Sequence, residues 1–364
     1  METTSHSHIS KTCIAYLAQF DRSDSLNENS LQAYPFAPYA AKHWISHAKS
    51  ADIDSTPDLQ KLATHLLLHH HVLANWTRIW DIEWPWRKGS NLTGVPRNVA
   101  PPLYYASMAD LGAVAKMLLE NHSDVNAQGG RYGNALQVAA MQGYEAIVQM
   151  LIENGADVNA QTQGRGFGNA LQAASIRGSE AIVKILIESG ADVNLRRGHY
   201  GSVLQAASMQ GSKAIVKMLI ESGADVNALG GYYGSALQAA SHHGSEAIVK
   251  MLIESGADVN VRRGHYGSAL QAASYHGSEA IVKMLIESSA DVNALGGHYG
   301  SALQAASIQG SEAIVKMLIE SDADVNTQGG PYDNALQAAS FHGHSAIVQL
   351  LLGNGAQAGM PEHF

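Results

Sequence analysis

Apolar and polar positions recur in one fixed order over the C-terminal two thirds of the chain. A leucine in the same local setting stands at positions 103, 136, 171, 204, 237, 270, 303 and 336, so the spacing is 33 residues at six steps and 35 at one. Each copy carries two short runs in which apolar residues return at helical spacing. A fixed period of this length predicts a solenoid of two-helix units, in which each unit buries its apolar face only against its neighbours.

The unit around Leu237 shows why two helices are expected in each copy. Ser235 is a candidate N-cap, because its hydroxyl can accept a hydrogen bond from a free backbone N–H in the first helical turn. The first helix should end near Gly244, and Ser245 should open the second, which Gly256 ends in a left-handed conformation. Ordering one such unit costs on the order of 50 kcal/mol, so the units must stack to be stable.

The first hundred residues lack the repeat and contain all five tryptophans. Helices are predicted near residues 9–20, 37–50 and 57–80. One interpretation is a helical cap that shields the apolar side of the first repeat. The other is an independent docking module built around Trp76, Trp80, Trp84 and Trp86.

The repeated unit resembles the ankyrin repeat. Each copy carries a segment such as Gly256-Ala-Asp-Val-Asn260 after its second helix, and Ser235-Ala-Leu-Gln238 stands where the family has Thr-Pro-Leu-His. The glutamine amide is expected to take over the bridging hydrogen bonds of that histidine. The connecting finger has the form G-G-x-Y-G, with an aromatic residue at 132, 167, 200, 233, 266, 299 and 332.

This resemblance implies an all-α ankyrin-repeat solenoid. We expect eight helix-turn-helix repeats with hairpin-like fingers and an N-terminal helical cap. The chain is accordingly divided into a helical N-terminal segment with its linker (1–100), eight repeats (101–358) and a C-terminal tail (359–364).

A second resemblance involves segments upstream of the repeats. The N-A-L-Q form of the repeat, together with K-T-C-I-A-Y-L at 11–17 and Y-P-F-A-P-Y-A-A-K-H-W at 34–44, is similar to fungal proteins in which a NACHT-type NTPase precedes ankyrin repeats. The sequence has no G-x-x-x-x-G-K-[ST] phosphate loop. The resemblance therefore implies a sensing or partner-binding arm without its NTPase, either a shortened relative or a fragment.

Charge and cysteine content argue against several classes of protein. The 23 Lys/Arg and 32 Asp/Glu give a net charge of −9, and the excess lies in the repeats because residues 1–100 hold nine of each sign. Direct nucleic-acid binding needs a basic face and is not expected. Cys13 is the only cysteine, which favours an intracellular protein of the cytoplasm, the nucleus or both. No signal-peptide order and no apolar run near about 18 residues is present, so no membrane association is expected.

The histidines at 65, 69, 70 and 71 form the cluster that most resembles a metal site. His65 and His69 stand four residues apart, but no cysteine and no suitably spaced carboxylate accompanies them, which favours a structural or solvated role. The Ser, His and Asp residues of the repeats lie one unit apart along an open surface, so no catalytic group of three converges. We expect no metal, no cofactor and no catalysis.

The copies differ from one another at the pair of residues that follows A-A-S and in the fingers. In ankyrin proteins these positions line the concave side, so the resemblance implies that they contact a partner. The alternative is drift at unconstrained positions. The candidate partner-binding residues are Arg196, Arg197, His199, Tyr232, His242, His243, Arg262, Arg263, His265, Tyr275, His276, His298, Ile308, Phe341 and His342.

Two arginine pairs stand out among these candidates. Arg196-Arg197 and Arg262-Arg263 recur in alternate fingers, 66 residues apart in sequence and about 20 Å apart in space at ~10 Å per unit. They would form a doubled basic patch suited to an acidic partner. A duplication that copied the arginines without a use is the alternative.

The helix-ending glycine is replaced in two neighbouring copies, repeats six and seven. Ser289 and Asp322 replace it, which costs roughly 0.5–1 kcal/mol each if the conformation is left-handed. We therefore expect residues 288–325 to open before the rest of the array.

These observations predict a non-catalytic scaffold or adaptor whose partners are one or more proteins. Two narrower hypotheses stay open. One is a regulatory or sensing arm of a NACHT-type NTPase signalling protein. The other is a transcriptional co-regulator, although no basic nuclear-import run is present.

Overall fold

The computed structural model describes residues 2–22, 25–86, 99–162 and 168–357, and it divides into two compact units, Met1–Gly166 and Phe167–Phe364. Each unit is described by itself. The predicted aromatic position 167, most of the expected linker and the tail at 359–364 lie outside the described residues.

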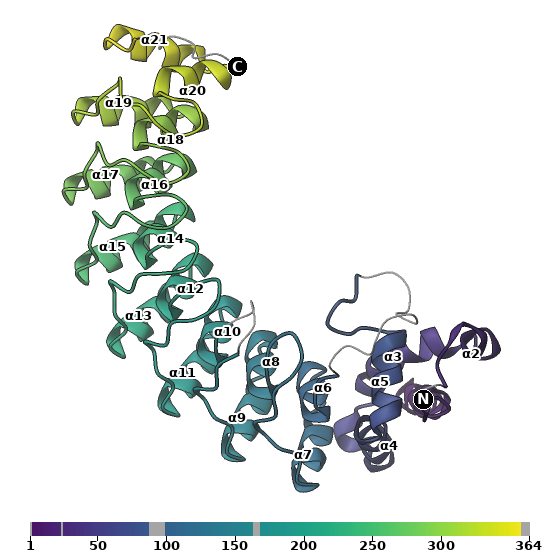
Figure 1. The fold of residues 1–364 in the computed structure, drawn as a ribbon. Coiled ribbons are helices and arrows are strands. Elements are labelled where there is room, and N and C mark those ends of the chain that lie inside the picture. The colour runs from purple at the N-terminus through teal and green to yellow at the C-terminus, as the bar shows by residue number, and fades with distance from the viewer. Residues whose placement is uncertain (1, 23–24, 87–98, 163–167, 358–364) are drawn as a thin grey trace. The chain divides into compact units, whose positions relative to one another are not determined.

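The regular elements of the described residues are helices, as predicted, and the fingers between them contain isolated β-bridges (Figure 1). The first unit contains α1 (Glu2–Leu17), α2 (Glu28–Ala33), α3 (Ala37–Ser50), η1 (Ile53–Ser55), α4 (Pro57–Leu68), α5 (His70–Ile79), α6 (Pro102–Met108), α7 (Gly112–Glu120), α8 (Ala135–Gln142) and α9 (Glu145–Glu153). The second contains α10 (Ala170–Arg177), α11 (Glu180–Glu188), α12 (Val203–Gln210), α13 (Lys213–Glu221), α14 (Ala236–His242), α15 (Glu246–Glu254), α16 (Ala269–His276), α17 (Glu279–Glu287), α18 (Ala302–Gln309), α19 (Glu312–Glu320), α20 (Ala335–Phe341) and α21 (Ser345–Gly353).

The pairs from α6/α7 to α20/α21 correspond to repeats one to eight. In repeat five the hydroxyl of Ser235 accepts a hydrogen bond from the backbone N–H of Gln238 at 3.2 Å, which confirms the predicted N-cap. The second helix buries Ile248, Val249 and Leu252 on one face. Gly256 follows at φ 85°, the left-handed conformation expected at the end of that helix.

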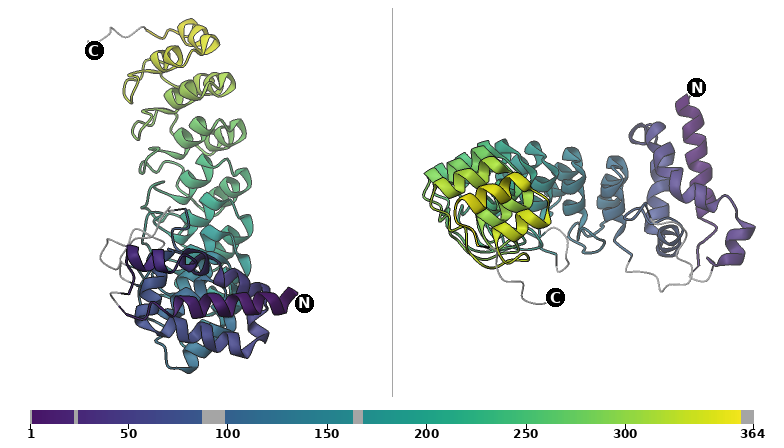
Figure 2. Two further views of the ribbon diagram at one scale, coloured as in Figure 1. Left: turned by 90° about the vertical axis from the view of Figure 1, so that its right-hand side faces the viewer. Right: turned by 90° about the horizontal axis from the view of Figure 1, so that it is seen from above.

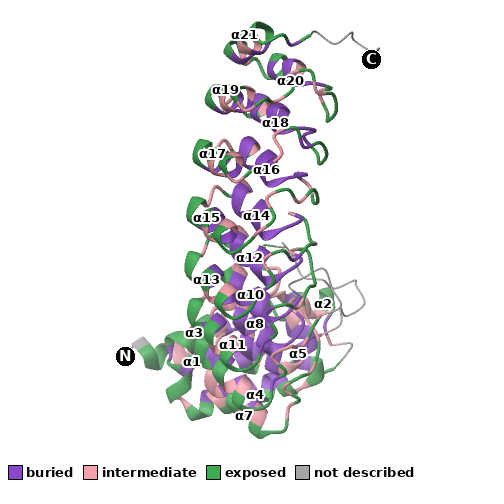
Figure 3. Ribbon diagram, turned by 90° about the vertical axis from the view of Figure 1, so that its left-hand side faces the viewer, coloured by how far each residue is buried: buried purple, intermediate pink, exposed green. Residues whose placement is uncertain are grey.

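The second unit is a stack of these pairs in two rows. The even-numbered helices form one row and the odd-numbered helices the other, and the fingers all leave the same side of the helices (Figures 1 and 2). The even-numbered row is largely buried, whereas the odd-numbered helices expose their outward face (Figure 3). The core of this unit therefore lies between neighbouring pairs, as the period predicts.

A glutamine holds each inner repeat to the next finger. The Nε2 of Gln238 donates to the carbonyl oxygens of Arg263 at 2.7 Å and Gly267 at 2.8 Å. Gln205, Gln271 and Gln304 make the corresponding bonds. The amide thus takes the bridging role expected of it, because its two N–H groups reach two carbonyl oxygens of one finger.

In the first unit, the N-terminal helices cover repeat one. Helix α4 packs on α7, and a carboxylate oxygen of Asp54 accepts a hydrogen bond from the backbone N–H of Ala113 at 2.8 Å, in the first turn of α7. The Lys49 ammonium contacts Asp110 at 3.1 Å. These contacts match the interpretation of residues 1–100 as a helical cap.

Details of the cap differ from the sequence predictions. The helix expected over 57–80 is broken at His69, which has extended backbone between α4 and α5. The Trp76 indole is 1% exposed and donates to the carbonyl of Ala41 at 2.9 Å, so it is a core residue and not a docking contact. Trp86 is 64% exposed.

Candidate interaction surface

The tips of four successive fingers carry a continuous row of stacked rings. His199, Tyr232, His265 and His298, here called the fingertip row, have ring centroids 5.5, 4.9 and 5.0 Å apart, with interplanar angles of 25°, 17° and 18°. The backbone N–H of each tip residue donates to the carbonyl oxygen of the preceding one, at 3.0, 2.9 and 2.8 Å. The four tips are therefore one ordered surface and not independent loops.

Glycine allows the fingers to approach one another this closely. A Cβ on Gly231 would lie 2.5 Å from the carbonyl carbon of Tyr200, and one on Gly264 would lie 2.3 Å from the carbonyl oxygen of Tyr233. Both glycines also have positive φ, 62° and 70°. The G-x-Y-G pattern of the fingers is thus explained by backbone packed against backbone.

The spacing of the fingertip rings is smaller than the ~10 Å per unit used to place the arginine pairs, whose own separation stays a prediction. Two stacking steps, of 5.5 and 4.9 Å, separate the rings of His199 and His265, so these tips lie much closer together than the ~20 Å expected for alternate fingers. The estimate of ~10 Å per unit holds for packed helices. The tips are instead joined by backbone hydrogen bonds, and their spacing resembles that of neighbouring β-strands.

Behind the tips, aromatic side chains of repeats five to seven form a second cluster, here called the inner cluster. His242 stacks on Tyr266 with centroids 4.3 Å apart, and a hydrogen bond of 3.0 Å joins its Nε2 to the Tyr266 hydroxyl. Tyr275 stacks on Tyr299 at 4.1 Å. Tyr266 and Tyr299 are buried, and Ile308 packs against them.

Burial sets the ionisation of the inner cluster. Desolvation, followed by the nearby His243 and His276, lowers the pKa of His242 to about 4, so its ring is neutral near pH 7. Desolvation also raises the pKa of the Tyr266 and Tyr299 hydroxyls.

Tyr275 and Ile308, which the sequence analysis placed at a partner contact, pack against this buried cluster. They therefore serve in part as packing between repeats.

The two arginines of each pair have different surroundings in the structure. Arg196 forms an ion pair with Asp225 at 2.5 Å, and Arg262 forms the equivalent pair with Asp291. The Asp of the following repeat thus neutralises the first arginine in each pair. The contact of these four arginines with a partner stays a prediction. Arg197 and Arg263 are exposed.

The remaining candidates fall into two places. His243 and His276 are exposed beside the inner cluster, where the Nε2 of His243 lies 2.9 Å from the Tyr233 hydroxyl. Phe341 and His342 lie in the last repeat, with Phe341 74% exposed. Most of the sequence candidates thus lie in repeats four to seven, and two lie in repeat eight. Tyr266 and Tyr299 were recognised as recurring aromatics but not as parts of this surface.

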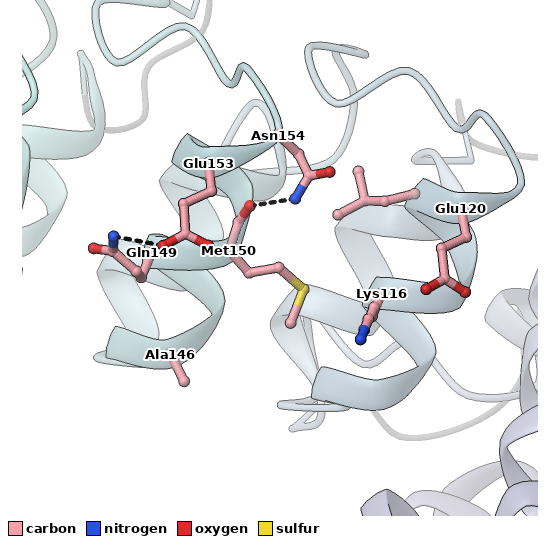
Figure 4. A pocket seen from close by; sticks show the side chains of 8 residues that line it. Lys116, Glu120, Ala146, Gln149, Met150, Glu153 and Asn154 are labelled. Carbon is pink, nitrogen blue, oxygen red and sulfur yellow. Dashed lines mark hydrogen bonds between the residues drawn. The ribbon is translucent and has the colours of Figure 1, made fainter.

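A groove in the first unit has a different lining from the fingertip row. It lies in the first unit between α7 and α9, encloses about 540 Å³, and is lined by Lys116, Leu119, Glu120, Ala146, Gln149, Met150, Glu153 and Asn154 (Figure 4). Its charged side chains are of both signs, and the Gln149 amide donates a hydrogen bond to the Glu153 carboxylate at 2.9 Å.

The described residues contain no grouped set of metal ligands and no membrane-spanning helix. Over the ranges described above, no three His, Cys, Asp or Glu side chains are grouped as they would be around an ion. His65 and His69 have ring centroids 6.1 Å apart. No helix in the same ranges has the length and apolar character needed to cross a bilayer.

Comparison with known proteins gives the family. A sequence profile of ankyrin repeats, in three copies, matches the chain in overlapping windows at 87–162, 103–197, 136–230, 170–263, 204–295, 237–329 and 270–361. The chain belongs to the ankyrin-repeat family. The predicted fold is thereby confirmed from sequence and from structure.

Two individual proteins are similar to this chain. The chain is 34% identical over 146 residues to the azaphilone pigments biosynthesis cluster protein L of Monascus ruber, a match that covers 37% of this chain and 31% of that protein. Its structure is similar to the crystal structure of the human ASB11 ankyrin repeat domain, with a TM-score of 0.53 and 28% identity over 62% of this chain and 99% of that domain.

Proposed function

We propose that this ankyrin-repeat chain is a non-catalytic interaction module that binds a partner protein through the fingertip row and the exposed residues beside it in repeats four to seven. Ankyrin repeats are generally protein-interaction modules. The observation that carries the proposal is the fingertip row itself. Exposed aromatic rings that are already ordered by stacking and by backbone bonds lose little conformational entropy when a partner covers them.

The inner cluster supports this role by fixing the base of the fingers. Tyr266 and Tyr299 join the fingers of repeats six and seven to the helices behind them. The contacts of the row are therefore held by buried side chains. Rigid support of this kind favours a specific site over a surface that adapts to many partners.

Two narrower roles belong to the same proposal. The likeness of residues 11–17 and 34–44 to segments of NACHT-type proteins favours an arm of an NTPase signalling protein. Those segments lie in α1 and near α3, which pack together in the cap. A transcriptional co-regulator acting through protein partners is the other hypothesis, and no contact in the structure favours it specifically.

The test is capture of partners by three forms of the tagged chain from extracts of the source cells. One variant carries His199→Ala, Tyr232→Ala and His298→Ala, which removes exposed rings of the row. The matched control carries Lys184→Ala, Lys217→Ala and Lys250→Ala on exposed positions of the odd-numbered helices. A captured protein is then purified and its Kd measured against each form.

We expect the fingertip variant to lose at least tenfold in affinity and the control to stay within twofold. Large exposed rings often dominate interface energies, at about 2 kcal/mol for each strong contact. Equal binding by wild type and the fingertip variant, with unchanged unfolding midpoints, would place the interaction elsewhere on the chain.

A further inference from the structure

Two of the four finger arginines form ion pairs within the chain, and the other two have no carboxylate partner among the described residues. The first arginine of each pair is neutralised within the chain, Arg196 by Asp225 and Arg262 by Asp291. Arg197 and Arg263 are exposed, and the described residues give their side chains no ion pair. Their backbone carbonyls accept hydrogen bonds from Gln172 and Gln238 at 3.1 and 2.7 Å, so the finger backbone is anchored while the guanidinium groups are left to solvent.

The tips around these arginines contain no negative charge. Residues 195–201, 228–234, 261–267 and 294–300 include no Asp or Glu, although the whole chain carries −9. The outer helices are the opposite case, since their lysines pair with glutamates of the same helix, as Lys217 does with Glu221 at 3.7 Å. Arg197 and Arg263 thus form an isolated basic strip on the fingers. This strip is a local feature, because the chain as a whole is acidic.

We propose that the fingertip row binds an acidic peptide segment of the partner protein, with the guanidinium groups of Arg197 and Arg263 contacting its carboxylates. This inference rests on the proposed function and adds the chemistry of the partner. A guanidinium presents a planar fork of N–H donors that matches a carboxylate. The stacked rings of the row cover one another's faces, so a bound chain would meet their edges, which carry the imidazole nitrogens and the Tyr232 hydroxyl.

The test is selection of peptides on the full chain. A phage-displayed library of random dodecapeptides is panned on immobilised wild type, on Arg197→Gln/Arg263→Gln, and on Lys184→Gln/Lys250→Gln. The control pair makes the same charge change at exposed positions on the outer helices. A selected peptide is then labelled, and its Kd is measured by fluorescence anisotropy at 50 and 300 mM NaCl.

We expect Asp and Glu to be enriched at least twofold over the input library on wild type and on the control, and not on the arginine variant. The selected peptide should bind the arginine variant at least tenfold more weakly and the control within twofold. Its affinity for wild type should fall several-fold at the higher salt, because the contact is exposed to solvent.

Three outcomes would overturn the inference. Selected peptides without acidic enrichment, or with equal affinity for the arginine variant, would leave the interaction function standing but assign its partner another chemistry. A labelled 20-nucleotide single-stranded DNA that binds more tightly than the peptide through the same arginines would mean a nucleic-acid ligand. A selection that returns no peptide above background also overturns it, and the capture experiment then judges the proposed function separately.

Discussion

At the scale of the residue, one glutamine per repeat carries much of the connection between helices and fingers. Gln238 is fully buried, and its amide bonds two carbonyl oxygens of the following finger. Gln337, in the last repeat, has no following finger among the described residues and is only partly buried. The same residue type thus has a structural role at one position and little at another.

Replacing Gln238 with alanine should lower the free energy of unfolding by about 1–3 kcal/mol, because the finger loses two hydrogen bonds to the helix behind it, at the carbonyl oxygens of Arg263 and Gly267. The Gln337→Ala variant should change it by less than about 0.5 kcal/mol. Urea unfolding followed by circular dichroism measures both. Equal losses would show that the amide acts through helix propensity and not through the finger.

A second prediction at this scale follows from the low pKa of His242. The folded chain binds fewer protons at this ring than the unfolded chain between about pH 4 and the ordinary value near 6.5. Its neutral form therefore contributes stability that is present above about pH 6.5 and is lost as the pH falls toward 4. The unfolding free energy of His242→Gln, measured by urea unfolding, should depend less on pH between 7.5 and 5.0 than that of wild type. Equal pH dependence of the two forms would contradict this assignment.

How much could be predicted at this scale depends on whether a residue acts locally. The Ser235 cap and the left-handed Gly256 follow from rules about neighbouring residues, and both are present. The ion pair of Arg196 with Asp225 joins residues 29 apart, and nothing in the local sequence distinguishes Arg196 from Arg197. Only the geometry of stacked fingers decides which arginine is neutralised.

At the scale of the element, the helix pairs are nearly identical, so their ends decide which is weakest. Ser289 and Asp322 adopt φ 66° and 67°, the conformation that glycine provides in most of the other copies. The strain predicted from sequence required a left-handed conformation at these two positions, and both adopt it. Each position carries a backbone strain of about 0.5–1 kcal/mol that its neighbours lack.

Amide hydrogen exchange should be faster over residues 288–325 than in repeats four and five. Ser289→Gly and Asp322→Gly should slow it and raise stability by about 0.5–1 kcal/mol each. Gly256→Ser is the reverse control and should make repeat five exchange faster. Uniform exchange across these repeats in the wild type would contradict the assignment of this segment as the weakest.

The element scale also shows where periodicity stops being informative. It predicts the helix pairs and their stacking, since each copy repeats the same buried face. It does not predict that the fingers touch, because Gly231 and Gly264 fit a flexible loop as well as a tightly packed one. The fingertip row was therefore visible in sequence as four candidate residues but not as one stacked surface.

At the scale of the whole molecule, the cap and the repeats can be followed separately. All five tryptophans lie in residues 1–100, so their fluorescence reports on the cap, while far-ultraviolet circular dichroism reports mainly on the repeats. Asp54 joins the two by accepting the hydrogen bond from Ala113 at the start of α7. Its carboxylate is also favourably placed near the positive end of that helix.

The Asp54→Ala variant should lower the free energy of unfolding detected by fluorescence by about 1 kcal/mol, the typical value of a helix cap. Asp54→Asn keeps an acceptor oxygen and should lose less. Asp21→Ala removes an exposed carboxylate of the cap that lies outside the helices and serves as the matched control. A fluorescence transition that does not move in Asp54→Ala would mean that the cap is stable without this contact to repeat one.

The close spacing of the fingertips also sets how many residues of a bound peptide chain can lie along them. Ring centroids about 5 Å apart place four tips along a line that an extended peptide, at roughly 3.3–3.6 Å per residue, crosses in about five residues. Four repeats, 33 residues apart in sequence, thus converge on a stretch no longer than a short linear motif. One more duplicated finger would lengthen the contacted stretch of peptide by less than two residues. Duplication of repeats here therefore adds contacts to each peptide residue more than it lengthens the peptide that is bound.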